Sequence, residues 1–248
     1  MFSAAVVVVA QQPSTLEMWP GAQYDPALPT VKKVLGFAPG ERVASPAELV
    51  HYFETLAAAA PGRMKVTEYA RSWEKRKLIY AAISSEANIK RLDEIKATMK
   101  RLADARQTNA AEAKRLMANL PAVITLAYGV HGNEISGPDA AMMTAYHLLA
   151  ARNDKLVANV LQNVVVLIDP TENPDGRNRF VHNYTVAEGI EPDGAVAAAE
   201  RNEPWPGGRT NHYHFDMNRD WFAMTQPESR GRVKMLLDWH PLVYADLH

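Results

Sequence analysis

Two residue types that bind divalent metal ions stand three positions apart in this sequence, at His131 and Glu134. They follow an apolar run, 122–127, and precede an apolar-periodic segment that begins near Gly137. We therefore place them at a turn between a strand and a helix, where an imidazole and a carboxylate can face one metal ion. Alone the pair is a weak signal, because a surface histidine beside a surface glutamate occurs in many chains.

The composition limits the chemistry that is available to such a site. The 248 residues include no cysteine, which excludes disulfides, thiolate zinc sites and cysteine nucleophiles. Any metal must therefore be held by histidines and carboxylates. The formal net charge of −1 gives no reason to expect nucleic acid or an acidic membrane surface as the main partner. No run reaches the roughly 18 apolar residues of a transmembrane helix.

Residues 1–10 are apolar and are followed by Gln11-Gln12-Pro13. They resemble the end of a secretory signal peptide, although no Lys or Arg precedes them. A frayed terminus and a first strand of the sheet are the alternatives. We expect a signal-peptide remnant over 1–10, with a secreted or periplasmic location, an extended lead-in over 11–44 and one domain over 45–248.

Turn signals and periodicity predict the elements that position the polar residues. Ser45-Pro46-Ala47-Glu48 is a capping box that opens a helix. Residues 136–139 are expected to cap the helix after His131 in the same way. The other expected elements are a hairpin of strands 65–70 and 78–84, a helical stretch 86–118, a helix 155–161, a strand 163–168, a helix 227–239 and a buried strand 242–248.

The order of these elements predicts an α/β fold. The strand–helix–strand order from 122 to 168 is typical of a parallel βαβ unit, and the continuous apolar run 163–168 is typical of a strand covered on both faces. We expect a mixed, largely parallel sheet with helices on both faces. Residues 170–226 have little periodicity and are predicted to be irregular and functional. The chain stops on a polar residue at a strand tip, which suggests truncation at the C-terminus.

Taken in order, the motifs resemble those of the zinc carboxypeptidase family, the metallopeptidases of carboxypeptidase A type, and within it the secreted or periplasmic bacterial branch. The resemblance runs from about residue 45 to the end. It implies hydrolysis of C-terminal peptide bonds through a metal-activated water, by a catalytic domain of which 45–248 is an incomplete part. The motifs are His131-x-x-Glu134, Asn173-Pro174-Asp175-Gly176, Asn218-Arg219-x-Trp221 and the strand that ends in His248.

The resemblance implies one zinc ion held by His131, Glu134 and His248. Two imidazoles and one carboxylate suit catalytic zinc, which keeps a position for water. His240 is the rival third ligand. It stands before Pro241, outside the strand, whereas His248 ends a strand, where ligands gather in open α/β sheets.

The resemblance also implies roles for the residues around the metal. Asp216 matches the carboxylate that orients the first zinc histidine. Asn218 and Arg219 match the pair that holds the C-terminal carboxylate of a peptide substrate, which a planar guanidinium grips in two places. Arg177 and Arg179 are the candidates for oxyanion stabilisation, and we select Arg179.

Two departures from the family pattern keep other functions open. The general-base glutamate and the substrate-capping tyrosine of the family lie on later parts of the fold that this chain does not contain, so we expect the chain itself to be inactive. The gap between Asn173 and Asn218 is long, and 205–208 is expected to lie in an inserted loop. The alternatives are a zinc deacylase or amidase for small N-acyl amino acids or cell-wall peptides, with a smaller pocket around 180–215, and a non-catalytic zinc-binding module.

Overall fold

A computed structural model describes residues 19–191 and 193–248. The expected signal-peptide remnant, 1–10, therefore lies outside the described residues. The described part of the lead-in is not extended throughout, because it contains helix α1 (Val31–Leu35) and buries Leu28 and Phe37 in the core of the domain. Among the described residues, no helix has both the length and the apolar character needed to cross a membrane.

The described strands form one mixed sheet in the order β1-β2-β4-β3-β5. The β1–β2 and β2–β4 pairs are antiparallel, whereas β3 runs parallel to both β4 and β5. The predicted mixed sheet, hairpin and parallel βαβ unit are confirmed, although antiparallel pairs are as frequent as parallel ones. The strands are β1 (Met64–Arg71), β2 (Lys77–Ile83), β3 (Ala122–Tyr128), β4 (Val164–Asp169) and β5 (Val243–Leu247).

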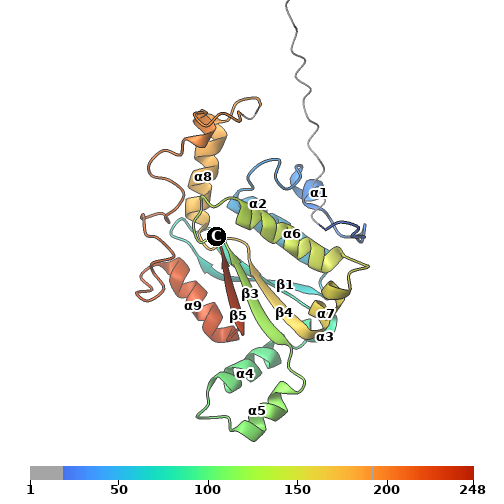
Figure 1. Cartoon of the computed structure of the whole chain (residues 1–248). Coiled ribbons are helices and arrows are strands. Elements are labelled where there is room, and N and C mark those ends of the chain that lie inside the picture. The colour runs from blue at the N-terminus through green and yellow to red at the C-terminus, as the bar shows by residue number, and fades with distance from the viewer. Residues whose placement is uncertain (1–18, 192) are drawn as a thin grey trace, which may run out of the picture.

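Strand β4 is buried on both faces, as its apolar run predicts. Val166 and Ile168 pack against helices α2 (Pro46–Ala59) and α6 (Ser136–Ala150), while Val165 packs on the opposite face against α4 (Leu92–Ala103) and α9 (Pro227–Trp239). Figure 1 shows the helices around the sheet. Alternate strand residues therefore supply two separate cores, and the prediction of helices on both faces is confirmed.

The predicted helical stretch 86–118 is divided into three helices. They are α3 (Glu86–Ile89), α4 and α5 (Ala110–Met117), and the helix before β4 is α7 (Lys155–Asn163). The capping box at the start of α2 is confirmed, since the Ser45 side chain accepts from the backbone of Glu48 and the Glu48 side chain accepts from the backbone of Ser45. Helix α9 has the predicted bounds.

The predicted cap at 136–139 is wrong. Helix α6 begins at Ser136 itself, and no side chain caps it. Asp139, which was expected to help the cap, instead accepts a hydrogen bond of 3.0 Å from the buried guanidinium of Arg177. Burial of that guanidinium requires a carboxylate partner, and this requirement overrides the local capping pattern.

The prediction that 170–226 is irregular is wrong for its first part, which forms helix α8 (Pro174–Ala187). The Asn173 side chain accepts from the backbone N–H of Gly176, and Pro174 occupies the first helical position. These are ordinary signals of a helix start. The apolar periodicity of α8 is weak because its first turn buries Asp175 and Arg177 rather than aliphatic side chains. A short 3₁₀ helix, η1 (Ala199–Arg201), follows.

Strand β5 was expected to be buried, and this is also wrong. It pairs with β3 alone among the described strands, and Val243 is 53% exposed. An apolar run identifies a strand, but its exposure depends on which neighbours lie beside it.

Candidate metal centre

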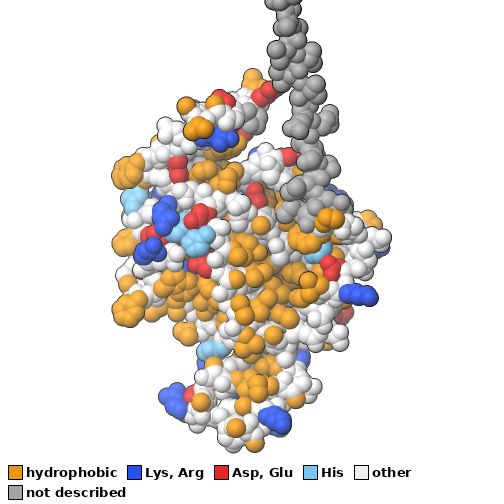
Figure 2. All heavy atoms as spheres, viewed as in Figure 1, with side chains coloured by type: hydrophobic (Ala, Val, Ile, Leu, Met, Phe, Trp, Pro, Cys, Tyr) orange, Lys and Arg blue, Asp and Glu red, His pale blue; other side chains and the backbone are white. Residues whose placement is uncertain are grey.

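The parallel strands β3 and β5 bring two distant parts of the chain to one edge of the sheet. His131 lies three residues beyond the end of β3, and His248 directly follows β5. Figure 2 shows histidine, acidic and basic side chains gathered where Figure 1 marks the C-terminus. The carboxyl ends of parallel strands are the usual location of sites in open α/β sheets.

The three residues expected to hold a metal converge at this edge. Nδ1 of His131 lies 2.8 Å from Oε1 of Glu134, and Nδ1 of His248 lies 3.0 Å from Oε2 of the same carboxylate. One ligand atom from each residue lies within 4.8 Å of the others. We call His131, Glu134 and His248 the candidate ligand set.

The candidate ligand set fits a zinc ion. Oε2 of Glu134 is buried and makes no hydrogen bond within the described residues, although Nδ1 of His248 is near it. A buried carboxylate oxygen without a hydrogen bond is costly unless another group satisfies it. Two imidazole nitrogens facing that carboxylate form a donor set that zinc prefers.

Asp216 contacts the outer nitrogen of His131. Its Oδ1 lies 3.0 Å from Nε2 of His131, and its Oδ2 accepts 2.9 Å from the guanidinium of Arg209. A proton on Nε2 that points at this carboxylate leaves Nδ1 available to a metal. Burial raises the pKa of Asp216, but the hydrogen bonds from His131, from the backbone of Asn218 and from Arg209 outweigh it, and the pKa lies below its ordinary value.

Asn218 and Arg219 lie next to the candidate ligand set. Nδ2 of Asn218 is 3.3 Å from Nε2 of His248, the nitrogen that faces away from Glu134. Arg219 is exposed, and within the described residues its guanidinium makes one hydrogen bond, to the Asn218 carbonyl. Most of its guanidinium donors therefore face solvent beside the site.

Arg179 makes its side-chain contacts away from the candidate ligand set, and its role in oxyanion stabilisation stays a prediction. Its guanidinium donates to the backbone carbonyls of Gly207, Thr210, Asn211 and His212, at 2.9–3.4 Å. A guanidinium that satisfies several carbonyls in this way holds the 207–212 loop against α8 and has few donors left for a substrate.

Arg177, the other candidate, is also occupied. It is fully buried and donates to Asp139 and to the carbonyls of Ala44 and Ile135. Burial lowers the pKa of its guanidinium to about 10. Arg177 therefore ties the start of α8 to the chain just after Glu134.

Sequence reasoning assigned no role to two residues that lie at the site. The side chain of Arg209 is 48% exposed and pairs with Asp216, but nothing in its sequence context separates it from the other arginines. Oδ2 of Asp246 lies 3.7 Å from Nε2 of His248. Its signal was available, because residues two apart on a strand face the same side.

Close backbone packing fixes the turn that carries His131. A Cβ on Gly132 would overlap the backbone nitrogen of Arg177 and would lie 2.6 Å from the carbonyl oxygen of Gly208. Only glycine allows the turn, the first turn of α8 and the 207–212 loop to meet this closely. Helix α9 supports the site from behind, since buried Arg232 donates 3.0 Å to the Met217 carbonyl, between Asp216 and Asn218.

Comparison with known proteins identifies the fold and the family. Among solved structures the chain is similar to a carboxypeptidase A from Helicoverpa armigera, with 16% identity, a TM-score of 0.51, and 88% of this chain aligned to 51% of that one. It is similar to thrombin activatable fibrinolysis inhibitor, with 16% identity, a TM-score of 0.51, and coverage of 84% and 47%. A putative carboxypeptidase A from Shewanella denitrificans gives 13% identity, a TM-score of 0.51, and coverage of 82% and 39%.

The chain thus spans about half the length of the first two of these carboxypeptidase-fold structures. A comparison with curated protein sequences found no match. The family model for zinc carboxypeptidases matches residues 49–235, well over half of the chain. The chain therefore belongs to the zinc carboxypeptidase family.

Proposed function

We propose that the protein is a zinc-dependent metallocarboxypeptidase that hydrolyses the C-terminal peptide bond of its substrates through a metal-activated water. The observation that carries this proposal is the convergence of the candidate ligand set, with both Nδ1 atoms turned toward Glu134 and with Asp216 on the outer nitrogen of His131. The apolar pattern of residues 1–10 supports a secreted or periplasmic location.

The residues of the site would have different roles in such a reaction. A zinc ion, when bound, would lower the pKa of its water ligand and polarise the scissile carbonyl. His131, Glu134 and His248 would hold the ion, and Asp216 would keep the proton of His131 on Nε2, so that Nδ1 remains available as a ligand. Asn133 and Ile135, on either side of Glu134, tie that turn to Glu203, two residues after η1, and to Arg177 of α8 respectively.

Asn218 and Arg219 would hold the free C-terminal carboxylate of the peptide. The exposed Arg219 guanidinium has donors available in the planar arrangement that matches a carboxylate. For stabilisation of the oxyanion we now propose Arg209 in place of Arg179. Arg209 is half-exposed and contacts Asp216 at the site, whereas the Arg179 guanidinium donates its hydrogen bonds to backbone carbonyls.

The chain on its own should bind the ion and the substrate but hydrolyse slowly. The reaction needs a carboxylate that takes a proton from water and returns it to the leaving amine, a contribution of about 10²–10⁴-fold. At the site within the described residues, Glu134 faces both histidines and Asp216 pairs with His131 and Arg209, while Asp246 lies 3.7 Å from the outer nitrogen of His248, the nitrogen that faces away from Glu134.

Peptide binding tests the proposal. The dissociation constant of an N-acetylated dipeptide and of its C-terminal amide would be measured with the zinc-loaded 248-residue protein. We expect the free acid to bind at least about tenfold more tightly, since a charge-assisted pair is worth roughly 1.5–3 kcal/mol. Arg219→Lys should remove most of this preference, because lysine cannot form the two-pronged contact.

Equal binding of the acid and the amide would contradict carboxylate recognition and favour the amidase alternative. Retention of zinc without binding of any peptide would favour the non-catalytic module. Arg230→Lys is the matched control. This arginine is also exposed, but it donates to the carbonyls of Met224 and Thr225 and has no contact with the site, so the acid preference should be unchanged.

A further inference from the structure

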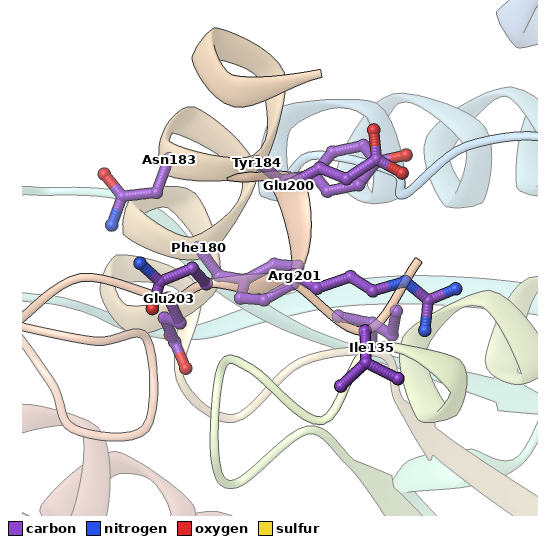
Figure 3. Close-up of a pocket in the computed structure, with 9 residues that line it drawn as sticks. Ile135, Phe180, Asn183, Tyr184, Glu200, Arg201 and Glu203 are labelled. Atoms are coloured by element: carbon purple, nitrogen blue, oxygen red, sulfur yellow. The ribbon is translucent and has the colours of Figure 1, made fainter. Parts of the chain in front are cut away.

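A cavity of about 630 Å³ lies between α8 and the segment that contains η1. Figure 3 shows its lining residues projecting from α8, from η1 and its flanks, and from the start of α6. Its volume falls within the range of pockets that take small ligands or several side chains.

One part of the cavity lining is aromatic and aliphatic. Phe180 and Tyr184 stand one helical turn apart on α8, with their rings nearly parallel and 6.3 Å between centroids. Ile135 and Val196 face the same cavity and are 39% and 93% exposed. Apolar side chains left open beside a site favour an apolar ligand, because covering them removes their surface from water.

The two acidic side chains of the lining, Glu200 and Glu203, accept hydrogen bonds from neighbouring segments. Glu203 accepts a hydrogen bond of 2.8 Å from the Asn133 side chain and another from the backbone of Gly208. Glu200 accepts 3.0 Å from the backbone of Asp193. These contacts join the η1 segment to the turn that carries Glu134. Asn183, Arg201 and Asn202 add polar groups to the lining, and the aromatic and aliphatic part is the surface that an apolar side chain would contact.

The cavity adjoins the turn that carries Glu134. Ile135 lines it and directly follows Glu134, and Glu203 lines it and contacts Asn133. Asn218 contacts the opposite member of the candidate ligand set, His248. A peptide held by its carboxylate at Asn218 and by its scissile carbonyl at the metal would therefore extend past Glu134 toward the cavity.

We propose that this cavity is a subsite for a bulky apolar or aromatic side chain of the peptide, two or three residues before its C-terminus. The inference rests on the proposed function, since that function sets the direction of the peptide. Phe180, Tyr184, Ile135 and Val196 form the surface that the side chain contacts, and they make the protein selective for what precedes the cleaved bond.

Calorimetric binding of defined peptides tests the subsite. The probes are acetyl-Xaa-Gly-Phe and acetyl-Xaa-Gly-Gly-Phe with Xaa as phenylalanine or alanine, each as free acid and as amide, with the zinc-loaded 248-residue protein. At one of the two positions we expect the phenylalanine peptide to bind about tenfold more tightly than the alanine peptide. That ratio corresponds to about 1.4 kcal/mol, slightly less than complete burial of an aromatic side chain would give.

Substitutions in the cavity lining test whether these residues cause the preference for phenylalanine over alanine. Phe180→Ala should reduce the ratio to below about twofold and leave the alanine peptide unaffected. Val196→Asp should act in the same direction, and because Val196 is 93% exposed its replacement requires no repacking. Phe222→Ala is the matched control, since Phe222 is 97% exposed and does not line the cavity.

The comparison of acid with amide and the comparison of phenylalanine with alanine peptides distinguish a failure of the subsite from a failure of the proposed function. If the acid and the amide bind alike while the phenylalanine preference persists and depends on Phe180, the subsite stands and carboxylate recognition fails. A phenylalanine-to-alanine ratio below about twofold at both positions overturns the subsite. So does a ratio that survives both Phe180→Ala and Val196→Asp, or the absence of binding by all peptides at millimolar concentration.

Discussion

The two halves of the metal centre are built differently. His131 is 2% exposed, follows a central strand, and has Glu134 on one ring nitrogen and Asp216 on the other. The side chain of His248 is 42% exposed, follows the edge strand β5, and has longer contacts on its outer nitrogen, 3.3 Å to Asn218 and 3.7 Å to Asp246. The first half is therefore pre-organised, whereas the second depends more on the ion itself for its position.

The difference follows from what lies behind each ligand. The turn at Gly132 touches the first turn of α8 and the 207–212 loop through the backbone, so His131 cannot shift without moving several elements. β5 contacts the sheet through β3 alone among the described strands. We expect changes on the His131 side to have the larger effects on stability and on metal affinity.

The largest expected effect is that of Gly132→Ala. The added Cβ would overlap backbone atoms of α8, which cannot move as a flexible side chain does. We expect a loss of more than about 3 kcal/mol in the free energy of unfolding, measured by chemical denaturation. Gly194→Ala is the control, because a Cβ there meets nothing within 4 Å. A loss below about 0.5 kcal/mol for Gly132→Ala would show that this half is not held by backbone packing.

Asp216→Asn should weaken zinc binding by about 10–100-fold, because the amide no longer favours the proton on Nε2 of His131. Asp246→Asn should weaken it by less than about fivefold, since Asp246 lies 3.7 Å from the outer nitrogen of His248. The measurement is competition with a chelator of known affinity. Equal losses from the two substitutions would contradict the proposed difference between the halves.

The smallest effect is expected from Glu48→Gln, which lies outside both halves. Burial raises the pKa of Glu48, but hydrogen bonds from Arg42 and from the Ser45 backbone outweigh it, and the folded pKa lies below 4.5. The ionised carboxylate therefore stabilises the fold above pH 4.5, and this contribution is lost as the pH falls through the folded pKa.

Glu48→Gln should accordingly reduce the free energy of unfolding by about 0.5–1 kcal/mol at pH 7 and flatten its decline in acid. Zinc affinity at pH 7 should be unchanged, because neither half of the metal centre is touched. A parallel loss of zinc affinity would mean that the site responds to general destabilisation, and the comparison of the halves would then be uninformative.

Sequence reasoning predicted the sheet and most of its helices because β4, α2 and α9 carry strong local signals. It missed α8, whose buried first turn is polar, and it could not foresee that β5 would be exposed, because exposure depends on neighbours. At the site it named residues that do converge, His131, Glu134, His248 and Asp216. It selected Arg179 for the oxyanion, but spacing in the sequence does not reveal that this guanidinium donates to backbone carbonyls.

The most direct test is the zinc content of the dialysed protein, measured by elemental analysis for the wild type, His131→Ala and His248→Ala. We predict one zinc per wild-type chain and no stoichiometric zinc in His131→Ala. His248→Ala should retain partial occupancy at micromolar free zinc, because the pre-organised pair of His131 and Glu134 remains. One zinc per chain in His131→Ala would contradict the proposed metal centre.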